Sequence, residues 1–257
     1  MRRVIVGFAL IATLAVPAAL LLTRPHWPVV TLGILVMALA HALVLWPTLR
    51  ANSQWLGPVM TCFETTSNEV WLTIDDGPSG DTPAMLDALD ARGVKATFFV
   101  KGALVEQRPD LVAMMLARGH HVENHSHTHP AGAFWRLPPK SLEHEIDACT
   151  GALEAASGVR SRLFRAPVGM KNPFVHPILA RRGMTLVGWS IRGFDSFGDD
   201  VQRVVRRIVP RVRAGSIVVM HQGRGFSVDC VSSVVDELHA KGYAFVVPAA
   251  ERLKTKR

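Results

Sequence analysis

Charged residues and cysteines are scarce in this sequence of 257 residues. Only 19% of the residues are charged, whereas 49% are hydrophobic. This excludes a disordered chain, which would need more charge and less apolar surface. The three cysteines, Cys62, Cys149 and Cys230, are widely spaced and form no Cys-x-x-Cys motif, which excludes a small disulfide framework. The sequence also lacks internal repeats and low-complexity segments.

Acidic residues are absent from the first fifty positions. The same region contains four arginines, Arg2, Arg3, Arg24 and Arg50. Two uncharged stretches, residues 4–22 and 29–46, are each long enough to cross a hydrocarbon core of about 30 Å as a helix. They predict a two-helix membrane hairpin. The alternative is a signal peptide followed by a buried core helix.

The arginines also predict an orientation. Arg2 and Arg3 precede the first stretch and Arg50 follows the second, so the positive-inside rule places both ends of the hairpin in the cytoplasm. We therefore expect a multi-pass protein of a bacterial-type inner (plasma) membrane whose large C-terminal region faces the cytoplasm, with a periplasmic placement as the alternative. Nucleic acid is not expected as a partner, because aromatic residues are not interleaved with the basic clusters.

The remaining sequence alternates short apolar runs with helical patterns. Seven strands are expected, at residues 70–74, 96–100, 121–123, 163–164, 185–189, 217–220 and 243–247. Such alternation predicts an α/β fold with a parallel sheet, open or closed into a barrel. The expected organisation is a hairpin at 1–50, a linker at 51–67, one domain at 68–250 and a basic tail at 251–257.

Polar side chains follow five of these strands where each strand ends. They are Asp75 and Asp76, His125 and His129, Arg165, Asp195, and His221. In a parallel barrel these ends meet at one mouth. The two histidines and Asp76 could bind a divalent metal ion, for which zinc suits the imidazole and carboxylate donors and other divalent transition ions are possible. Such an ion lowers the pKa of bound water from 15.7 to about 7.

The other polar residues would complete a hydrolytic site. Asp75 would act as general base and His221 would protonate a leaving group. Arg165 would keep Asp75 ionised through a charge-assisted hydrogen bond. Each feature also has an ordinary explanation: a histidine-rich surface loop, a turn at Asp75-Asp76-Gly77-Pro78, or a buried core histidine at position 221. The functional interpretation depends on their conjunction.

Four motifs occur in order: Thr73-Ile-Asp-Asp-Gly-Pro78, His125-Ser-x-x-His129, Arg165-x-Pro-x-Gly169 and Val219-Met220-His221. Together, over about residues 68–250, they resemble the polysaccharide deacetylases (NodB-homology domain, carbohydrate esterase family 4). The resemblance implies a distorted (β/α) barrel, a metal bound by Asp76, His125 and His129, Asp75 as base, His221 as acid and Arg165 as the group positioning Asp75. It also implies removal of an N-acyl group, usually acetyl, from an amino sugar. Pro167, Val168 and Gly169 of the third motif are expected to contact substrate.

The fourth motif departs from the family pattern. In Trp189-Ser-Ile-Arg-Gly-Phe-Asp-Ser196, Arg192 stands where many members have an aspartate that tunes the acid histidine, and Ser196 replaces a tryptophan. Asp195 is therefore the candidate for that tuning. Val168 and Gln222 also replace a common tyrosine and a frequent aspartate. These departures indicate a substrate different from plain chitin or peptidoglycan.

Our hypothesis is an N-deacylase of a lipid-linked amino sugar at the inner-membrane surface. Membrane lipid is an expected partner, because the basic tail and the arginines of residues 201–212 would be attracted to anionic lipid. The alternatives are a periplasmic deacetylase of peptidoglycan or another wall glycan, and a catalytically silent membrane protein that binds sugar or metal.

Overall fold

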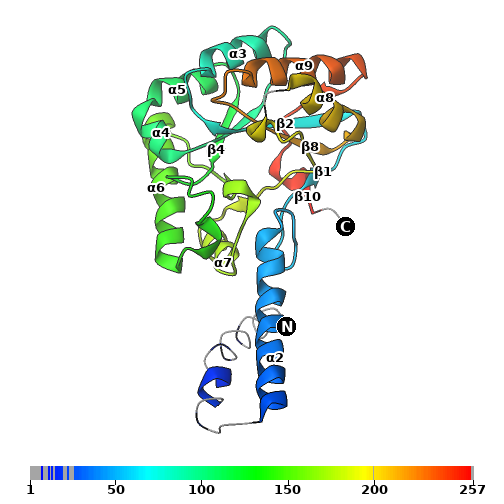
Figure 1. Ribbon diagram of the computed structural model, residues 1–257. Coiled ribbons are helices and arrows are strands. Elements are labelled where there is room, and N and C mark those ends of the chain that lie inside the picture. Colours follow the sequence, from blue (N-terminus) through cyan, green and yellow to red (C-terminus); the bar gives the residue numbers. More distant parts are fainter. Residues whose placement is uncertain are drawn as a thin grey trace.

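The protein is described from a computed structural model, which covers residues 26–198 and 200–255 together with residues 7, 11, 13, 15–19 and 22. Most of the expected first membrane span, residues 4–22, lies outside the described residues. The second span is present as one long helix, α2 (Trp27–Leu49), which projects from a compact domain (Figure 1). Of its residues only Ala40, Pro47 and Thr48 are buried, so α2 is not a core helix.

The sheet of the domain has ten strands in the described part of the chain. They are β1 (Cys62–Phe63), β2 (Glu69–Gly77), β3 (Thr97–Val100), β4 (His121–Asn124), β5 (Leu163–Phe164), β6 (Thr185–Leu186), β7 (Ile191–Arg192), β8 (Ser216–His221), β9 (Ala244–Phe245) and β10 (Leu253–Lys254). Their order is β10-β1-β8-β2-β3-β4-β5-β6, with β7 on β8 and β9 on β2. The seven strands expected from the sequence are present and pair parallel with one another.

The sheet curls toward a barrel. An isolated parallel bridge joins Met60, just before β1, to Val187, just after β6. Met60 N donates to Leu186 O at 2.9 Å, and Gly188 N donates to Met60 O at 2.8 Å. This bridge draws the two sides of the sheet together, which confirms the distorted (β/α) barrel.

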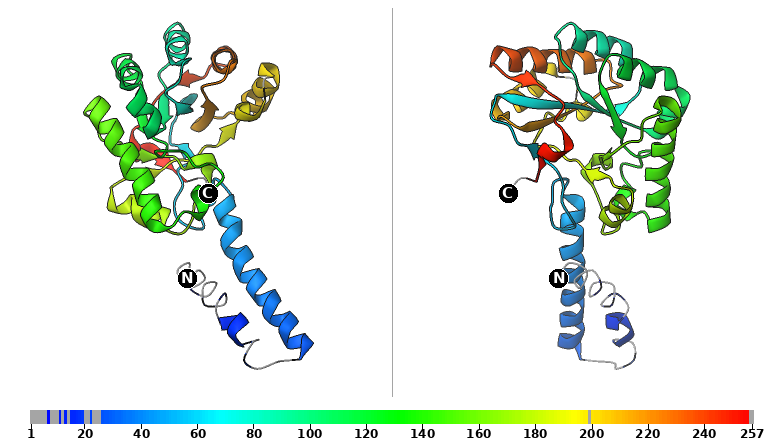
Figure 2. Two further views of the ribbon diagram at one scale, coloured as in Figure 1. Left: turned by 60° about the vertical axis from the view of Figure 1, so that its left-hand side comes forward. Right: turned by 180° about the vertical axis from the view of Figure 1, so that it is seen from behind.

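Helices cover the outside of the curved sheet (Figure 2). They are α3 (Thr82–Asp90), α4 (Gly102–Gln107), α5 (Pro109–Ala117), α6 (Pro139–Ser157), α7 (Val175–Arg181), α8 (Val201–Ile208) and α9 (Ser227–Ala240). The apolar positions of α6, Leu142, Ile146, Cys149 and Leu153, are all buried, as their helical spacing predicts. The main core lies between these helices and the buried strands β2, β3 and β8, where each buried aliphatic or aromatic side chain contributes about 1.5–3 kcal/mol.

Two segments outside the expected domain belong to the sheet. Residues 51–67 were expected as a linker, but they contribute Met60 and β1. The basic tail was expected from residue 251, but η5 (Ala250–Arg252) and β10 lie there, and β10 pairs antiparallel with β1. Both strands have only two residues, and neither shows a sequence pattern that local analysis can detect.

The C-terminal end of α2 is fixed to the domain. Lys171 is fully buried; its Nζ donates to Arg50 O at 3.0 Å and to Ala51 O at 2.8 Å, and its backbone N donates to Thr48 O at 3.2 Å. Asn52 Nδ2 donates to Trp189 O at 2.6 Å. A buried ammonium at the carbonyl end of a helix is favourable for the helix dipole as well. The helix therefore meets the domain in a defined place.

Candidate active site

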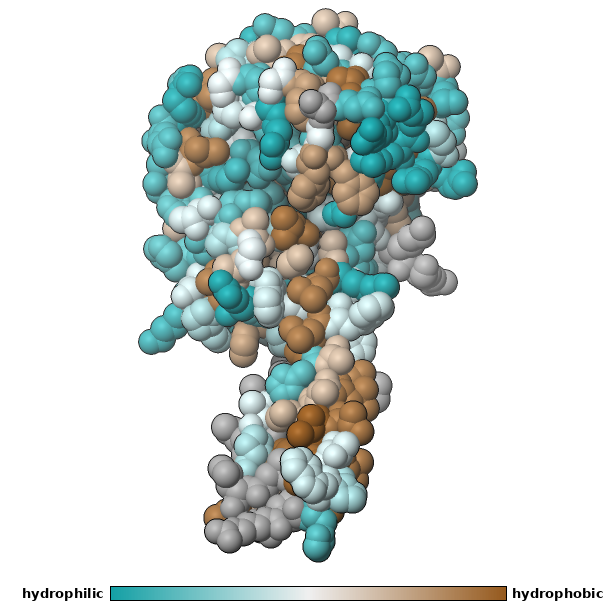
Figure 3. All heavy atoms as spheres, in the orientation of Figure 1, coloured by the Kyte–Doolittle hydropathy of each residue, from teal (hydrophilic) through white to brown (hydrophobic). Residues whose placement is uncertain are grey.

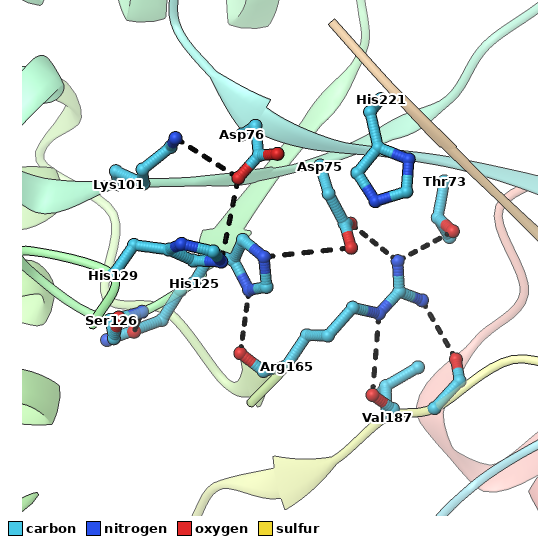
Figure 4. Close-up of polar contacts among 12 residues, drawn as sticks. Thr73, Asp75, Asp76, Lys101, His125, Ser126, His129, Arg165, Val187 and His221 are labelled. Carbon is cyan, nitrogen blue, oxygen red and sulfur yellow. Dashed lines mark hydrogen bonds and ion pairs between the residues drawn. The ribbon is translucent and has the colours of Figure 1, made fainter. Parts of the chain in front are cut away.

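The candidate site lies where the central strands end. Asp75 is in β2, directly opposite His221 of β8 in the register of the two strands. His125 follows β4, and Arg165 follows β5. The strand ends thus bring together residues that are far apart in the sequence, and Figure 4 shows their side chains converging on one space.

Arg165 holds Asp75 in place. Its side chain is completely buried, and Nη1 donates to Asp75 Oδ1 at 2.6 Å and to Thr73 Oγ1 at 2.8 Å. Nη2 donates to Gly188 O at 2.9 Å (Figure 4). The guanidinium also lies 4.1 Å from the ring centroid of Phe99. The expected hydrogen bond from Arg165 to Asp75 is therefore present. It is made to Oδ1, and Arg165 makes no hydrogen bond to Oδ2.

Asp76, His125 and His129 form a cluster of potential metal ligands. One donor atom from each lies within 4.8 Å of the other two. His129 Nε2 is 3.6 Å from Asp76 Oδ1. Backbone with positive φ at Asp76 (77°) and at His129 (54°) turns these side chains toward one another, an unusual conformation for residues other than glycine.

The protonation of this cluster fits a divalent cation. Burial is the largest effect on Asp76 and raises its pKa, but His125, His129 and Lys101 together lower the pKa to about 2. Burial lowers the pKa of His129 to about 3 and lowers the pKa of His125 as well. One carboxylate and two neutral imidazoles are the forms that bind metal.

Hydrogen bonding in the cluster also fits a divalent metal ion. His125 Nδ1 lies 2.8 Å from Arg165 O, so Nδ1–H donates there and Nε2 keeps its lone pair. Asp76 Oδ1 is buried without a hydrogen bond of good geometry, although Lys101 Nζ is 3.1 Å away. The residues present therefore fit a divalent metal ion.

Sequence reasoning missed three residues that shape this cluster. Lys101 pairs with Asp76 and directly follows β3, so the strand-end rule would have found it. Glu145 of α6 accepts hydrogen bonds from His127 N at 3.0 Å and Thr128 N at 2.9 Å, which holds the histidine loop. Asn124 Oδ1 accepts from Ser126 N at 2.8 Å in the same loop. The Glu145 contact is tertiary, whereas the Asn124 contact is a local turn between residues two apart in the sequence.

His221 is paired with Asp195. Asp195, in η3 (Asp195–Phe197), accepts from His221 N through Oδ2 at 2.7 Å, and its Oδ1 lies 3.0 Å from His221 Nδ1. Burial is the largest effect on His221 and lowers its pKa, but the hydrogen bond and charge of Asp195 outweigh it and the pKa is raised. The histidine is thus poised to carry a proton.

The third motif forms part of the wall of the cavity in which these residues lie. Pro167, Val168 and Gly169 make up η2 (Pro167–Gly169), where Val168 has a φ of 47° and lines the cavity. Gly169 has a φ of +74°, and a Cβ there would lie 2.4 Å from Ala51 Cβ. Only glycine fits this approach to the end of α2.

A cavity of about 1000 Å³ contains the cluster, Asp75 and His221. Its wall includes Val168 and Trp189, and it also includes Trp46 and Leu49 of α2. The volume is ample for more than a single sugar ring. The candidate site and the end of the apolar helix therefore share one cavity.

Comparisons with known proteins agree with this geometry. The family model for polysaccharide deacetylase matches residues 64–187. A chitooligosaccharide deacetylase from Bradyrhizobium is 33% identical over 190 residues, covering 72% of this chain and 86% of that protein. The chain belongs to the polysaccharide deacetylase family.

Other members of the family extend this result. The peptidoglycan-N-acetylglucosamine deacetylase PgdA of Listeria monocytogenes is 31% identical, covering 70% of this chain and 38% of that protein. A family 4 carbohydrate esterase from Streptomyces lividans, solved in complex with acetate, has a TM-score of 0.68 and 30% identity, covering 74% of this chain and 98% of that one. Membership makes the chain a hydrolase of carbon–nitrogen bonds other than peptide bonds.

Proposed function

We propose that this protein removes an N-acyl group, normally acetyl, from an amino sugar. The observation that carries the proposal is the single cavity in which Asp75, His221 and the Asp76–His125–His129 cluster meet. The relatives that act on chitooligosaccharides and on peptidoglycan N-acetylglucosamine support the substrate class.

The side chains divide the reaction between them. Asp75 Oδ1 is held by Arg165, so Oδ2 is the oxygen that takes a proton from the attacking water. His221, with its raised pKa and Asp195 behind it, donates a proton to the departing amine. Val168 lines the cavity, and its backbone N–H would be a donor for the developing oxyanion. This assigns Asp75 as base, His221 as acid and Asp195 and Arg165 as positioning residues.

Asp76, His125 and His129 would hold the metal ion, most suitably zinc given two imidazoles and one carboxylate. When bound, such an ion supplies Lewis-acid polarisation of the acyl oxygen and a lower pKa for water. Lys101 would lose its ion pair with Asp76 when the metal ion binds.

We also propose that α2 is a retained membrane anchor. Its polar side chains are satisfied internally, as a lipid-exposed span requires: Thr31 Oγ1 donates to Trp27 O at 3.0 Å, and His41 Nδ1 lies 2.7 Å from Met37 O. His41 Nε2 lies 3.1 Å from Thr13 Oγ1, so Thr13 of the first apolar stretch lies beside α2. Cleavage after α2 would remove Trp46 and Leu49 from the cavity wall and Thr48 O, which accepts from Lys171 N, and this argues against α2 as a cleaved signal sequence.

A lipid-linked amino sugar is the substrate that suits this arrangement, because the cavity opens beside the end of the anchor. Figure 3 shows apolar surface running from α2 onto the adjoining face of the domain. Helix α8, in contrast, lies at the end of the domain away from α2 (Figure 1), so its arginines do not support the expected attraction to the same membrane.

Arg50 at the end of α2 supports a cytoplasmic domain, and a periplasmic wall-glycan deacetylase needs the opposite orientation. Alkaline phosphatase fused after Arg257 distinguishes them: an inactive fusion supports the cytoplasmic placement, and an active one overturns it.

The activity is tested with purified full-length protein in detergent, loaded with zinc and supplied with soluble and lipid-linked N-acetyl amino sugars. Release of acetate by the wild type and its loss in Asp75→Asn are expected. Arg213→Gln, an exposed residue before β8 and outside the cavity wall, is the matched control. Failure to deacylate any amino sugar would leave the alternative of a silent sugar-binding or metal-binding protein.

A further inference from the structure

The cavity wall carries positive charge that N-deacylation does not use. Three arginines line it, Arg50, Arg192 and Arg224. The acidic side chains in that wall are Asp75, which is paired with Arg165, and Asp76, which is paired with Lys101. Among the residues that the structure describes, no ion pair joins any of the three arginines to an acid. The wall is therefore cationic beside the reacting groups.

Arg192 is the innermost of the three. It lies in β7 opposite Val219 of β8, two residues before His221. Its guanidinium carbon is 3.8 Å from the ring centroid of Phe194 and 5.8 Å from that of Trp189. The two rings orient the guanidinium plane without occupying its N–H groups. Burial lowers the pKa of Arg192, and no neighbouring acid raises it. A partly desolvated, unpaired guanidinium is a favourable place for an anion.

Arg50 adds a second cation to the wall. It directly follows α2, and its guanidinium carbon lies 3.9 Å from the ring centroid of Trp46. If α2 spans a membrane, Arg50 lies where lipid phosphate groups lie. Exposed apolar side chains line the same cavity: Leu49, Val168 and Phe197, the last 79% exposed.

We infer that Arg192 binds a phosphate group of the substrate, and that Arg50 and Arg224, which line the same cavity, add to the positive charge of its wall. The substrate class is then a phosphate-linked N-acyl amino sugar, in which the phosphate joins the sugar to a lipid or stands free. This inference depends on the proposed deacylase function. It also accounts for the arginine at the position where many family members have an aspartate, because a cation there suits an anionic substrate.

The test compares three substrates of one N-acetyl amino sugar: lipid-linked through phosphate, as a soluble sugar phosphate, and as a neutral soluble oligosaccharide. The full-length protein is assayed in nanodiscs, and the readout is the ratio of kcat/KM for each phosphate substrate to that for the neutral one. We expect Arg192→Gln to lower this ratio about tenfold or more, since a hydrogen bond between charged groups is lost. Arg192→Lys should restore part of it, and Arg213→Gln should leave it unchanged.

The outcomes separate the two proposals and the two sources of phosphate. A preference for the lipid-linked substrate, lost in Arg50→Gln and Arg192→Gln, supports phosphate bound at the membrane end. If the soluble sugar phosphate is preferred over the neutral oligosaccharide as strongly as the lipid-linked substrate is, the phosphate site is supported and the phosphate need not be joined to a lipid. If the wild type deacylates all three equally well, or if Arg192→Gln lowers all three rates by the same factor, the phosphate site is refuted while the deacylase function stands. If no substrate is deacylated, the proposed function fails instead.

Discussion

Replacing Asp195 with asparagine tests how the proposed acid is tuned. Asp195 accepts from His221 N at 2.7 Å and lies 3.0 Å from His221 Nδ1. The amide has nearly the shape of the carboxylate, so its oxygen can still accept the backbone hydrogen bond. The substitution therefore removes the negative charge and leaves the local fold in place.

The size of the effect follows from the surroundings of His221. Burial lowers the pKa of His221, and Asp195 is the main group that raises it again. Loss of a hydrogen-bonded opposite charge lowers such a pKa by about 1–3 units, and one unit corresponds to about 1.4 kcal/mol. The imidazolium donates the proton, so activity falls as the pH rises through this pKa. The alkaline limb should therefore move to lower pH by about one unit or more in Asp195→Asn.

The assay is kcat/KM as a function of pH for the wild type, Asp195→Asn and a control. Asp229→Asn serves as the control, because Asp229 is an exposed acid in the first turn of α9. Its alkaline limb should coincide with that of the wild type. If Asp195→Asn lowers kcat and its alkaline limb does not move, Asp195 has only a structural role and the reasoning is refuted.

Four further predictions follow from the site and its attachments. Asp75→Asn should lower kcat by about 10²–10⁴ with little change in KM, and an unchanged kcat would remove Asp75 as the base. Chelation should abolish turnover and a divalent ion should restore it, whereas full activity after chelation would contradict a metal role. Glu145→Gln weakens two backbone hydrogen bonds to the histidine loop, so zinc affinity measured by competition should fall about 10–100-fold. An unchanged affinity would show that the loop keeps its conformation without the Glu145 carboxylate. Lys171→Met removes the donor to Arg50 O and Ala51 O, so proteolysis between α2 and the domain should be faster, and an unchanged cleavage rate would deny that this contact fixes the helix.

The main elements of the fold were predictable because their patterns are local. The buried strands β2, β3 and β8 are built around short apolar runs, and α6 has its apolar residues at helical spacing. The short strands β1, β7 and β10 and the helix α4 were not predicted. Two-residue strands have no periodicity, and their place is set by hydrogen bonds to partners that are distant in the sequence.

The candidate site was predictable to a similar degree. Asp75, Asp76, His125, His129, Arg165 and His221 lie at or just beyond the ends of strands, so the rule that parallel strand ends converge was sufficient to group them. Lys101 obeys the same rule and was missed. Glu145 lies in the middle of α6, and nothing in the sequence around it indicates that its carboxylate reaches back to the histidine loop.

The sequence by itself determined the alternation of strands and helices, the apolar segment that became α2, and the residues that converge at the strand ends, because each is encoded in spacing and residue type within a short stretch. Only the tertiary structure decided that Asp195 reaches His221, that Lys171 holds the end of α2, and that Trp46, Leu49 and Arg192 line the same cavity as Asp75. These are contacts between segments separated by long stretches of chain. They depend on how the sheet curls, and no local pattern in the sequence specifies that curvature.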